Sequence, residues 1–169
     1  MRTKILAVGA VLAIGAAMAG PFVRAAAAQE AIYIVRHAER VDDEKLSSLS
    51  KEGRARASRL AKILRDAGIS QMFVSEYQRT SQTAAPLAAR LGLTPAAVAA
   101  DDLATLLVMI RAAGPRARVF VVGHSDTIPA LLKALGCKPG VTIAKAEYDN
   151  LFIVLPGKES EPVLIRLRY

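Results

Sequence analysis

A run of four apolar, mostly β-branched residues, residues 32–35, leads directly into Arg36 and His37. Such a run predicts a strand buried on both faces of a sheet. A second apolar run, residues 119–122, is followed one residue later by His124, so both histidines of the chain come after a predicted strand. Side chains at the carboxyl ends of strands in open α/β sheets face the crevice where such folds bind ligands. We therefore expect both histidines at one ligand site.

The order of the predicted elements indicates the fold class. Strand and helix alternate three times, and two strands joined by a tight turn follow. This order predicts a three-layer α/β/α sandwich with a mostly parallel sheet and an antiparallel edge strand. The predicted strands are residues 31–35, 72–74, 118–122, 151–155 and 163–167, and the predicted helices are residues 51–68, 77–91, 103–113 and 126–135.

Individual residues predict where these elements begin and end. Ser50 is a suitable N-cap for the first helix, and Gly68 is expected to end it. Pro86 lies inside the second helix and is expected to kink or divide it. Residues 94–100 are expected to form a loop or a short strand.

The first 28 residues resemble a secretory signal peptide. A short positive head precedes residues 5–23, which carry no charge. Small residues allow cleavage after Ala19 or after Ala28, and we adopt Ala28 because the earlier site leaves an apolar segment on the mature chain. This predicts one domain, residues 29–169, exported to the periplasm or the cell exterior. The alternative is an uncleaved leader that anchors the protein in a membrane.

Composition excludes several function classes. The formal charge of +8 suits an anionic partner, but the few aromatic residues and the lack of a lysine-rich block argue against nucleic acid. One cysteine, Cys137, and two histidines form no convincing zinc set, so we expect no metal and no other cofactor. The sequence has neither a Walker-type loop nor a Gly-x-Ser-x-Gly elbow, and no pattern in it indicates an oligomeric state.

Four residues that follow predicted strands suit a phosphoryl group. Guanidinium forks match pairs of phosphate oxygens, and an imidazole in such a setting can accept the phosphoryl group covalently. The alternative is a cluster that only holds an anion, which would make the protein a non-catalytic phosphate-binding or interaction module on the same fold. The four residues are Arg36, His37, Arg79 and His124.

Three short motifs, taken in order, resemble those of the histidine phosphatase superfamily, also called phosphoglycerate mutase-like. The first is similar to its Arg-His-Gly-Glu signature, the second to Ser-x-x-x-Arg-x-x-x-Thr-Ala, and the third to Gly-His. The resemblance covers residues 31–169, and the chain is identified as a short, exported bacterial member. The three motifs are Arg36-His37-Ala38-Glu39, the segment from Ser75 to Ala84, and Gly123-His124.

This resemblance implies a phosphoric monoester hydrolase that needs no metal ion. His37 would attack phosphorus and become phosphohistidine, Arg36 and Arg79 would hold the non-bridging oxygens, and His124 would bind the transferring group. Water would then hydrolyse the intermediate. The substrate would be a phosphorylated small molecule or a phosphoprotein. Mutase activity is not expected, because the chain is short and its leader predicts export.

Two positions depart from the family pattern. Ala38 replaces the usual glycine but keeps the small size that the site needs. The general acid that protonates the leaving group has no clear position, and two of its candidates, Asp101 and Asp102, serve equally well as helix caps. Short phosphohistidine phosphatases of this family lack a conventional acid, because phosphohistidine has a good leaving group. The candidate acids are Asp101, Asp102, Asp126 and Glu39.

Overall fold

The computed structural model describes residues 29–138, 140–157 and 160–169. The predicted signal peptide, residues 1–28, lies outside the described residues. No helix in the described part of the chain is long and apolar enough to cross a membrane. The elements are β1 (Ala31–Arg36), α1 (Lys51–Ile63), β2 (Gln71–Val74), α2 (Gln78–Leu91), β3 (Ala96–Ala97), α3 (Leu103–Ala112), β4 (Arg118–Gly123), α4 (Thr127–Ala134), β5 (Asn150–Leu155) and β6 (Val163–Arg168).

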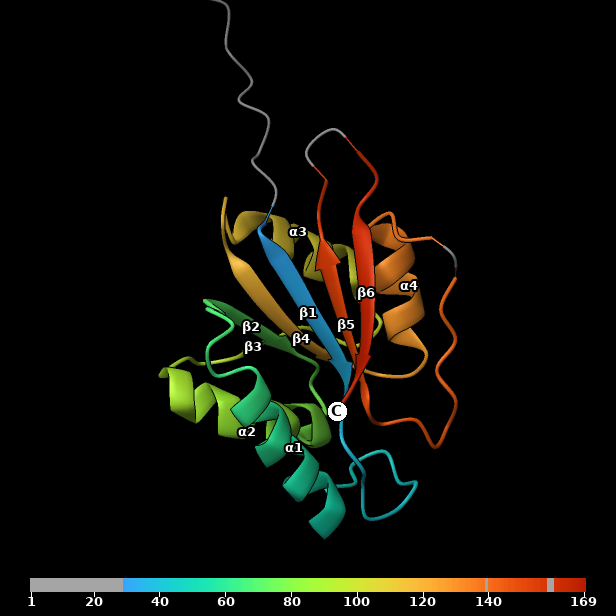
Figure 1. Cartoon of the computed structure of the whole chain (residues 1–169). Coiled ribbons are helices and arrows are strands. Elements are labelled where there is room, and N and C mark those ends of the chain that lie inside the picture. Colours follow the sequence, from blue (N-terminus) through green and yellow to red (C-terminus); the bar gives the residue numbers. More distant parts are fainter. Residues whose placement is uncertain (1–28, 139, 158–159) are drawn as a thin grey trace, which may run out of the picture.

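The six strands form one mixed sheet in the order β3-β2-β4-β1-β5-β6 (Figure 1). The first four strands in this order run parallel, whereas β5 is antiparallel to β1 and β6 is antiparallel to β5. The predicted mostly parallel sheet with an antiparallel element at its edge is therefore confirmed. The antiparallel strand is β5, which lies one place in from the edge, and the short strand β3 falls in the segment expected to form a loop or a short strand.

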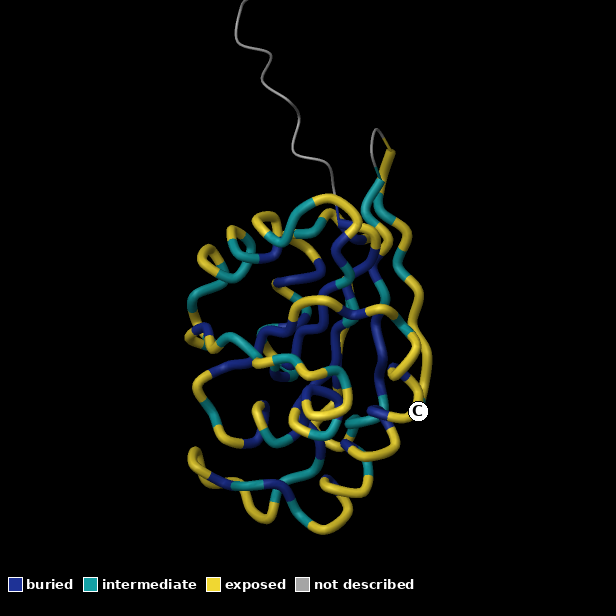
Figure 2. Tube along the Cα trace, turned by 90° about the vertical axis from the view of Figure 1, so that its left-hand side faces the viewer, coloured by how far each residue is buried: buried dark blue, intermediate teal, exposed yellow. Residues whose placement is uncertain are grey.

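The helices cover both faces of the sheet, with α1 and α2 on one side and α3 and α4 on the other (Figure 1). Alternation along the strands supplies both cores. In β1, Ile32 and Ile34 pack with the helices α3 and α4, whereas Val35 packs with α1 and α2. In β4, Val121 packs with α3 and α4, and Val122 packs with α1 and α2. Buried residues consequently concentrate along the strands (Figure 2), and the predicted three-layer architecture is confirmed.

Local signals in the sequence set most of the helix boundaries. Ser50 caps α1, and its side chain accepts a hydrogen bond from the backbone N–H of Gly53, as expected. However, α1 ends at Ile63, and Gly68, with a φ of 67°, belongs to the turn that follows. Of the two effects expected of Pro86, a kink or a division, the division is wrong, because α2 is continuous from Gln78 to Leu91. Burial of one face of α2 against the sheet compensates for the hydrogen bond that proline removes.

Candidate active site

The register of β1 and β4 places the two histidines side by side. Arg36 pairs with Gly123 across these parallel strands, so His37 and His124 each follow as the next residue at the same edge of the sheet. The backbone N–H of His37 donates to the carbonyl of Gly123 at 2.9 Å. The two ring centroids are 5.3 Å apart. The expected meeting of both histidines at one site is therefore present in the structure.

Hydrogen bonding fixes the tautomer of His37. Its Nδ1 lies 2.8 Å from the carbonyl oxygen of Ala38, and a carbonyl can only accept, so Nδ1 carries the proton. In the neutral ring, Nε2 then holds the lone pair, and it has no hydrogen-bond partner among the described residues. The segment is held in turn by Thr83, whose hydroxyl accepts from the N–H of Ala38 at 3.0 Å and donates to the carbonyl of Arg79 at 2.7 Å.

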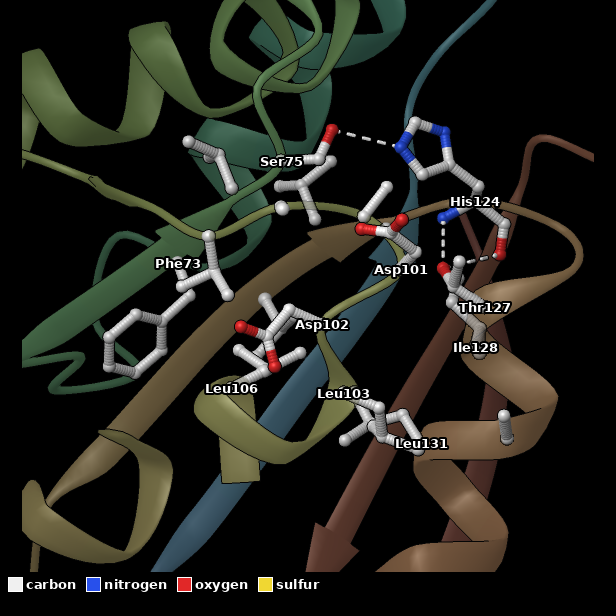
Figure 3. Close-up of a pocket in the computed structure, with 18 of the residues that line it drawn as sticks. Phe73, Ser75, Asp101, Asp102, Leu103, Leu106, His124, Thr127, Ile128 and Leu131 are labelled. Atoms are coloured by element: carbon white, nitrogen blue, oxygen red, sulfur yellow. Dashed lines mark hydrogen bonds between the residues drawn. The ribbon is translucent and has the colours of Figure 1, made fainter. Parts of the chain in front are cut away.

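His124 is oriented by a chain of hydroxyl groups. Its Nε2 lies 2.9 Å from the hydroxyl of Ser75 (Figure 3). The Ser75 hydroxyl lies 3.1 Å from the hydroxyl of Thr80. Thr80 donates to the carbonyl of Tyr77 at 2.7 Å. Because the Thr80 hydroxyl gives its one proton to Tyr77, the Ser75 hydroxyl donates to Thr80. Nε2 of His124 then donates to Ser75. This arrangement leaves Nδ1 of His124 as the unprotonated nitrogen of the neutral ring.

Arg36 is clamped between a loop and an aromatic ring. Its Nη1 donates to three backbone carbonyls, those of Ala144, Lys145 and Glu147, at 3.1, 2.8 and 3.2 Å. Its guanidinium carbon stands 4.1 Å from the centre of the Tyr148 ring. The loop after α4 thus fixes the orientation of a side chain that the sequence places at the end of β1.

Arg79 is held in the same manner from the opposite side of the site. Its Nη1 donates to the carbonyl of Lys45 at 2.6 Å, and its guanidinium carbon lies 4.3 Å from the centre of the Tyr77 ring. Each buried arginine is therefore fixed at one nitrogen and on one face, which leaves the rest of its fork available.

A polar cavity of about 570 Å³ collects these groups. Three buried guanidinium Nε atoms at this cavity, those of Arg36, Arg40 and Arg79, have no hydrogen-bond partner among the described residues. Burial lowers the pKa of Arg36 and Arg79, and the positive charge of Arg40 lowers both further. Unpartnered, mutually repelling N–H donors are what an oxyanion would satisfy. The cavity is therefore suited to an anion.

Both imidazoles are neutral in this setting. Burial lowers the pKa of His37 from 6.5 to about 3, with added repulsion from His124 and the arginines, although the Ala38 carbonyl opposes the shift. Burial also lowers the pKa of His124 to about 4, and the charge of Arg79 adds to this effect. A neutral His37 with a free Nε2 is chemically a nucleophile at ordinary pH.

The four candidate acids occupy different positions. Asp101 and Asp126 line the polar cavity, whereas Asp102 and Glu39 do not. The Asp126 carboxylate caps α4 by accepting from the N–H of Thr127, and that of Asp102 caps α3 by accepting from Thr105. The carboxylate of Asp101 has no hydrogen-bond partner among the described residues.

Glu39 faces α1 rather than the cavity. Its carboxylate accepts three hydrogen bonds of 2.6 to 2.9 Å from Arg56. The Arg56 side chain lowers the pKa of Glu39 against the opposing effect of its burial. This geometry favours a structural ion pair for Glu39.

The sequence did not single out several residues that line the site. Arg40 and Lys45, from the loop before α1, and Tyr77, which precedes α2, line the cavity. Tyr148, from the loop before β5, packs against Arg36 and His37. A third arginine four residues after Arg36 is the one signal that could have drawn attention to the loop before α1. Among residues 29–138, 140–157 and 160–169, no group of three metal-ligating side chains comes together.

One comparison with known proteins indicates a family. The model of the histidine phosphatase superfamily (branch 1) matches residues 32–104. A search of curated proteins finds no match. The matched residues contain two of the three motifs, with His37 and Arg79.

Solved structures share the fold at low sequence identity. The protein histidine phosphatase SixA, solved with tungstate, is 20% identical with a TM-score of 0.64, over 82% of this chain and 96% of that one. A protein of Agrobacterium tumefaciens assigned as the phosphohistidine phosphatase SixA is 20% identical with a TM-score of 0.61, over 83% and 99%. Mycobacterial glucosyl-3-phosphoglycerate phosphatase, solved with inorganic phosphate, is 16% identical with a TM-score of 0.63, over 83% and 96%.

The sheet and the solved structures define the fold, which is the phosphoglycerate mutase-like α/β fold. Within this fold, the segment of residues 32–104 matches the model of the histidine phosphatase superfamily.

Proposed function

We propose that the polar cavity is the active site of a metal-independent phosphatase that works through a phosphohistidine on His37. One observation carries the proposal: an imidazole with an uncommitted Nε2 lines the same cavity as three guanidinium Nε–H donors that lack partners. The match of residues 32–104 to the superfamily model and the fold shared with solved phosphatases support phosphatase activity in general terms. The substrate would be a phosphomonoester or a phosphoprotein.

In the first step, Nε2 of His37 forms a bond to phosphorus as the bond from phosphorus to the ester oxygen breaks. Arg36, Arg40 and Arg79 hold the non-bridging oxygens, so their charge compensates the charge that develops there. The dianion offsets the burial that keeps His124 neutral, so His124 can take a proton on Nδ1 and donate to the phosphoryl group. In the second step, the oxygen of water bonds to phosphorus as the bond from phosphorus to Nε2 of His37 breaks. The bond electrons return to Nε2, which regenerates neutral His37, and the protons of the water leave with the phosphate.

Asp101 is the best of the four candidates for the general acid. It lines the cavity and its carboxylate is free of other hydrogen bonds among the described residues, whereas Asp102, Asp126 and Glu39 are committed to backbone or to Arg56. If Asp101 protonates the leaving oxygen, Asp101→Asn should slow phenyl phosphate more than para-nitrophenyl phosphate, because the nitrophenolate leaves without help. Equal losses on both substrates would exclude Asp101 from this role.

The decisive test is hydrolysis of para-nitrophenyl phosphate by the parent protein and by His37→Ala, with Arg59→Ala on the outer face of α1 as the matched control. We expect activity in the parent and the control that falls by at least about 100-fold in His37→Ala. Labelled phosphate should remain on the parent after an alkaline denaturing quench, which preserves phosphohistidine. Phosphate binding without hydrolysis of this ester or of a phosphohistidine peptide would instead indicate a binding module.

We also propose that the protein is exported. The uncharged segment of residues 5–23 behind a positive head supports this proposal. The mass of the protein recovered outside the cytoplasm tests it, because cleavage after Ala28 yields a chain that begins at Gln29. A protein that keeps its first residues in a membrane fraction would favour the anchored alternative.

A further inference from the structure

A second cavity, of about 330 Å³, adjoins the polar one between the sheet and the helices α3 and α4 (Figure 3). Its walls are mainly apolar. A cavity of about 150 Å³ is enough to hold a benzene ring, so this one has room for a group of one or two rings. The large apolar side chains in its lining are Phe73, Val98, Leu103, Leu106, Val121, Ile128 and Leu131.

The two cavities share part of their lining. The shared residues are Ala100, Asp101, His124, Asp126 and Thr127. In Figure 3, Asp101 lies between His124 and the apolar group that includes Leu106. A molecule held by an anionic group in the polar cavity can therefore extend past Asp101 into the apolar one.

Apart from Asp101, which also lines the polar cavity, the polar side chains around the apolar cavity each have a hydrogen-bond partner. Asp102 accepts from the N–H of Thr105 at 2.9 Å, Asp126 accepts from Thr127 at 3.0 Å, and the Thr127 hydroxyl accepts from the N–H of His124 at 3.0 Å. A substrate with many hydroxyl groups would leave them without partners in this cavity, whereas an apolar group loses nothing.

We propose that the apolar cavity binds the leaving group of the substrate, and that the substrate is an aryl or branched alkyl phosphomonoester. The inference rests on the proposed function of the polar cavity, because the phosphoryl group anchors the molecule. It deepens that function by assigning the alcohol part of the ester to a second site. The ester oxygen of such a substrate would lie near Asp101, which lines both cavities and which in its carboxylic acid form would donate the proton to the leaving oxygen.

Binding of two phosphonates tests the subsite separately from catalysis, since neither is hydrolysed. We expect the full protein to bind naphthylphosphonate at least about 10-fold more tightly than methylphosphonate, as measured by calorimetry. Leu106→Gln should reduce this ratio to about threefold or less. Leu107→Gln is the matched control, because Leu107 is an equally half-buried residue of α3 that packs on the same core but does not line the cavity.

Methyl NMR of the parent provides a readout that needs no variant. Naphthylphosphonate, but not methylphosphonate, should shift the methyl signals of Ile128 and Leu131, which line only the apolar cavity of the two. Equal affinities for the two phosphonates, as when another segment or molecule fills the cavity, would overturn the proposal, and so would equal effects of the two glutamine variants. A clear naphthyl preference in a protein that hydrolyses no phosphoester would keep the subsite and reject the proposed function.

Discussion

The imidazole rings of His37 and His124 stand 5.3 Å apart at the ends of two adjacent parallel strands. Both rings are buried, and their neighbours include the charged forks of Arg36 and Arg79. Protonating either ring would therefore add a charge in a poorly solvated place that is already positive. Both rings stay neutral until an anion enters the cavity.

NMR can observe this pair directly, because the chain has only two histidines. In phosphate-free buffer, with no histidine tag, we expect neither ring to titrate between pH 5 and 8, since burial holds the pKa of His37 at about 3 and that of His124 at about 4. The nitrogen shifts of His37 should report the Nδ1–H tautomer. The chain unfolded in urea, with titration near pH 6.5, is the control. A midpoint near 6.5 in the folded protein would contradict the assignment.

The same burial makes stability depend on pH. The folded pKa of each histidine lies below the unfolded value, so below about pH 6.5 the unfolded chain binds more protons than the folded one. The free energy of unfolding is therefore highest above pH 6.5 and falls as the pH decreases. Between pH 6.5 and 5 the loss should approach about 1.4 kcal/mol per pH unit for each histidine. Urea unfolding across this window measures it, and His124→Gln should halve the slope.

Arg40 tests whether the third arginine helps to hold the anion. Arg40→Ala should weaken the binding of inorganic phosphate by about 10-fold, because it removes a charged donor whose Nε has no other partner among the described residues. Calorimetry gives the dissociation constant. Arg65→Ala removes an exposed arginine that pairs only with Asp66, and it should leave phosphate binding unchanged. Equal affinity of the two variants for phosphate would show that Arg40 does not help to bind the anion.

Glu39 distinguishes a structural role from a catalytic one. Glu39→Gln should lower the free energy of unfolding by about 1–2 kcal/mol, because it weakens the partly buried ion pair with Arg56. The rate per folded molecule should change by less than about threefold, whereas loss of a general acid costs about 100-fold or more. Glu52→Gln, at an exposed position of α1, is the control for stability. A collapse in rate at unchanged stability would reinstate Glu39 as the acid.

At Gly53, helix propensity and packing predict opposite effects of a substitution by alanine. Propensity alone predicts that Gly53→Ala stabilises α1 by about 1 kcal/mol. However, a Cβ there would lie 2.1 Å from the carbonyl oxygen of Glu39, so we expect a net loss of about 1–3 kcal/mol. Gly140→Ala, where an added Cβ meets nothing within 4 Å, should be tolerated. Denaturant unfolding measures the free energy of unfolding of both variants. A Gly53→Ala variant more stable than the parent would mean that the backbone around Glu39 moves away from the added Cβ.

The sequence predicts the parts of this structure that depend on local pattern. The apolar run before Arg36 identifies a buried strand, and the equivalent run before His124 identifies its partner, so the meeting of the two imidazoles follows from the carboxyl ends of parallel strands. Ser50 marks the start of α1 for an equally local reason. The predicted end of α1 at Gly68 is wrong, because a glycine with positive φ occurs within turns as well as at the ends of helices.

Other features depend on contacts between distant segments. Arg40 reaches the cavity because the loop that bears it is tied back by the bridge between Arg40 and Leu49. Tyr148 faces Arg36 because more than one hundred residues later the chain returns beside β1. No periodicity in the sequence encodes these approaches. Spacing could not distinguish the four candidate acids either. The contacts that engage Asp102, Asp126 and Glu39, and the lack of a partner for Asp101 among the described residues, appear only in three dimensions.

The histidines and the arginines of this site are held in place by different parts of the fold. The histidines are fixed by the hydrogen-bonded ladder of β1 and β4, which lies in the centre of the sheet. The arginines take their orientation from irregular segments, through the carbonyls of Lys45 and Lys145. Loops open at lower free energy than central strands. In the proposed phosphatase, the arginines could therefore shift to fit substrates of different shape, while the distance between His37 and His124 stays constant.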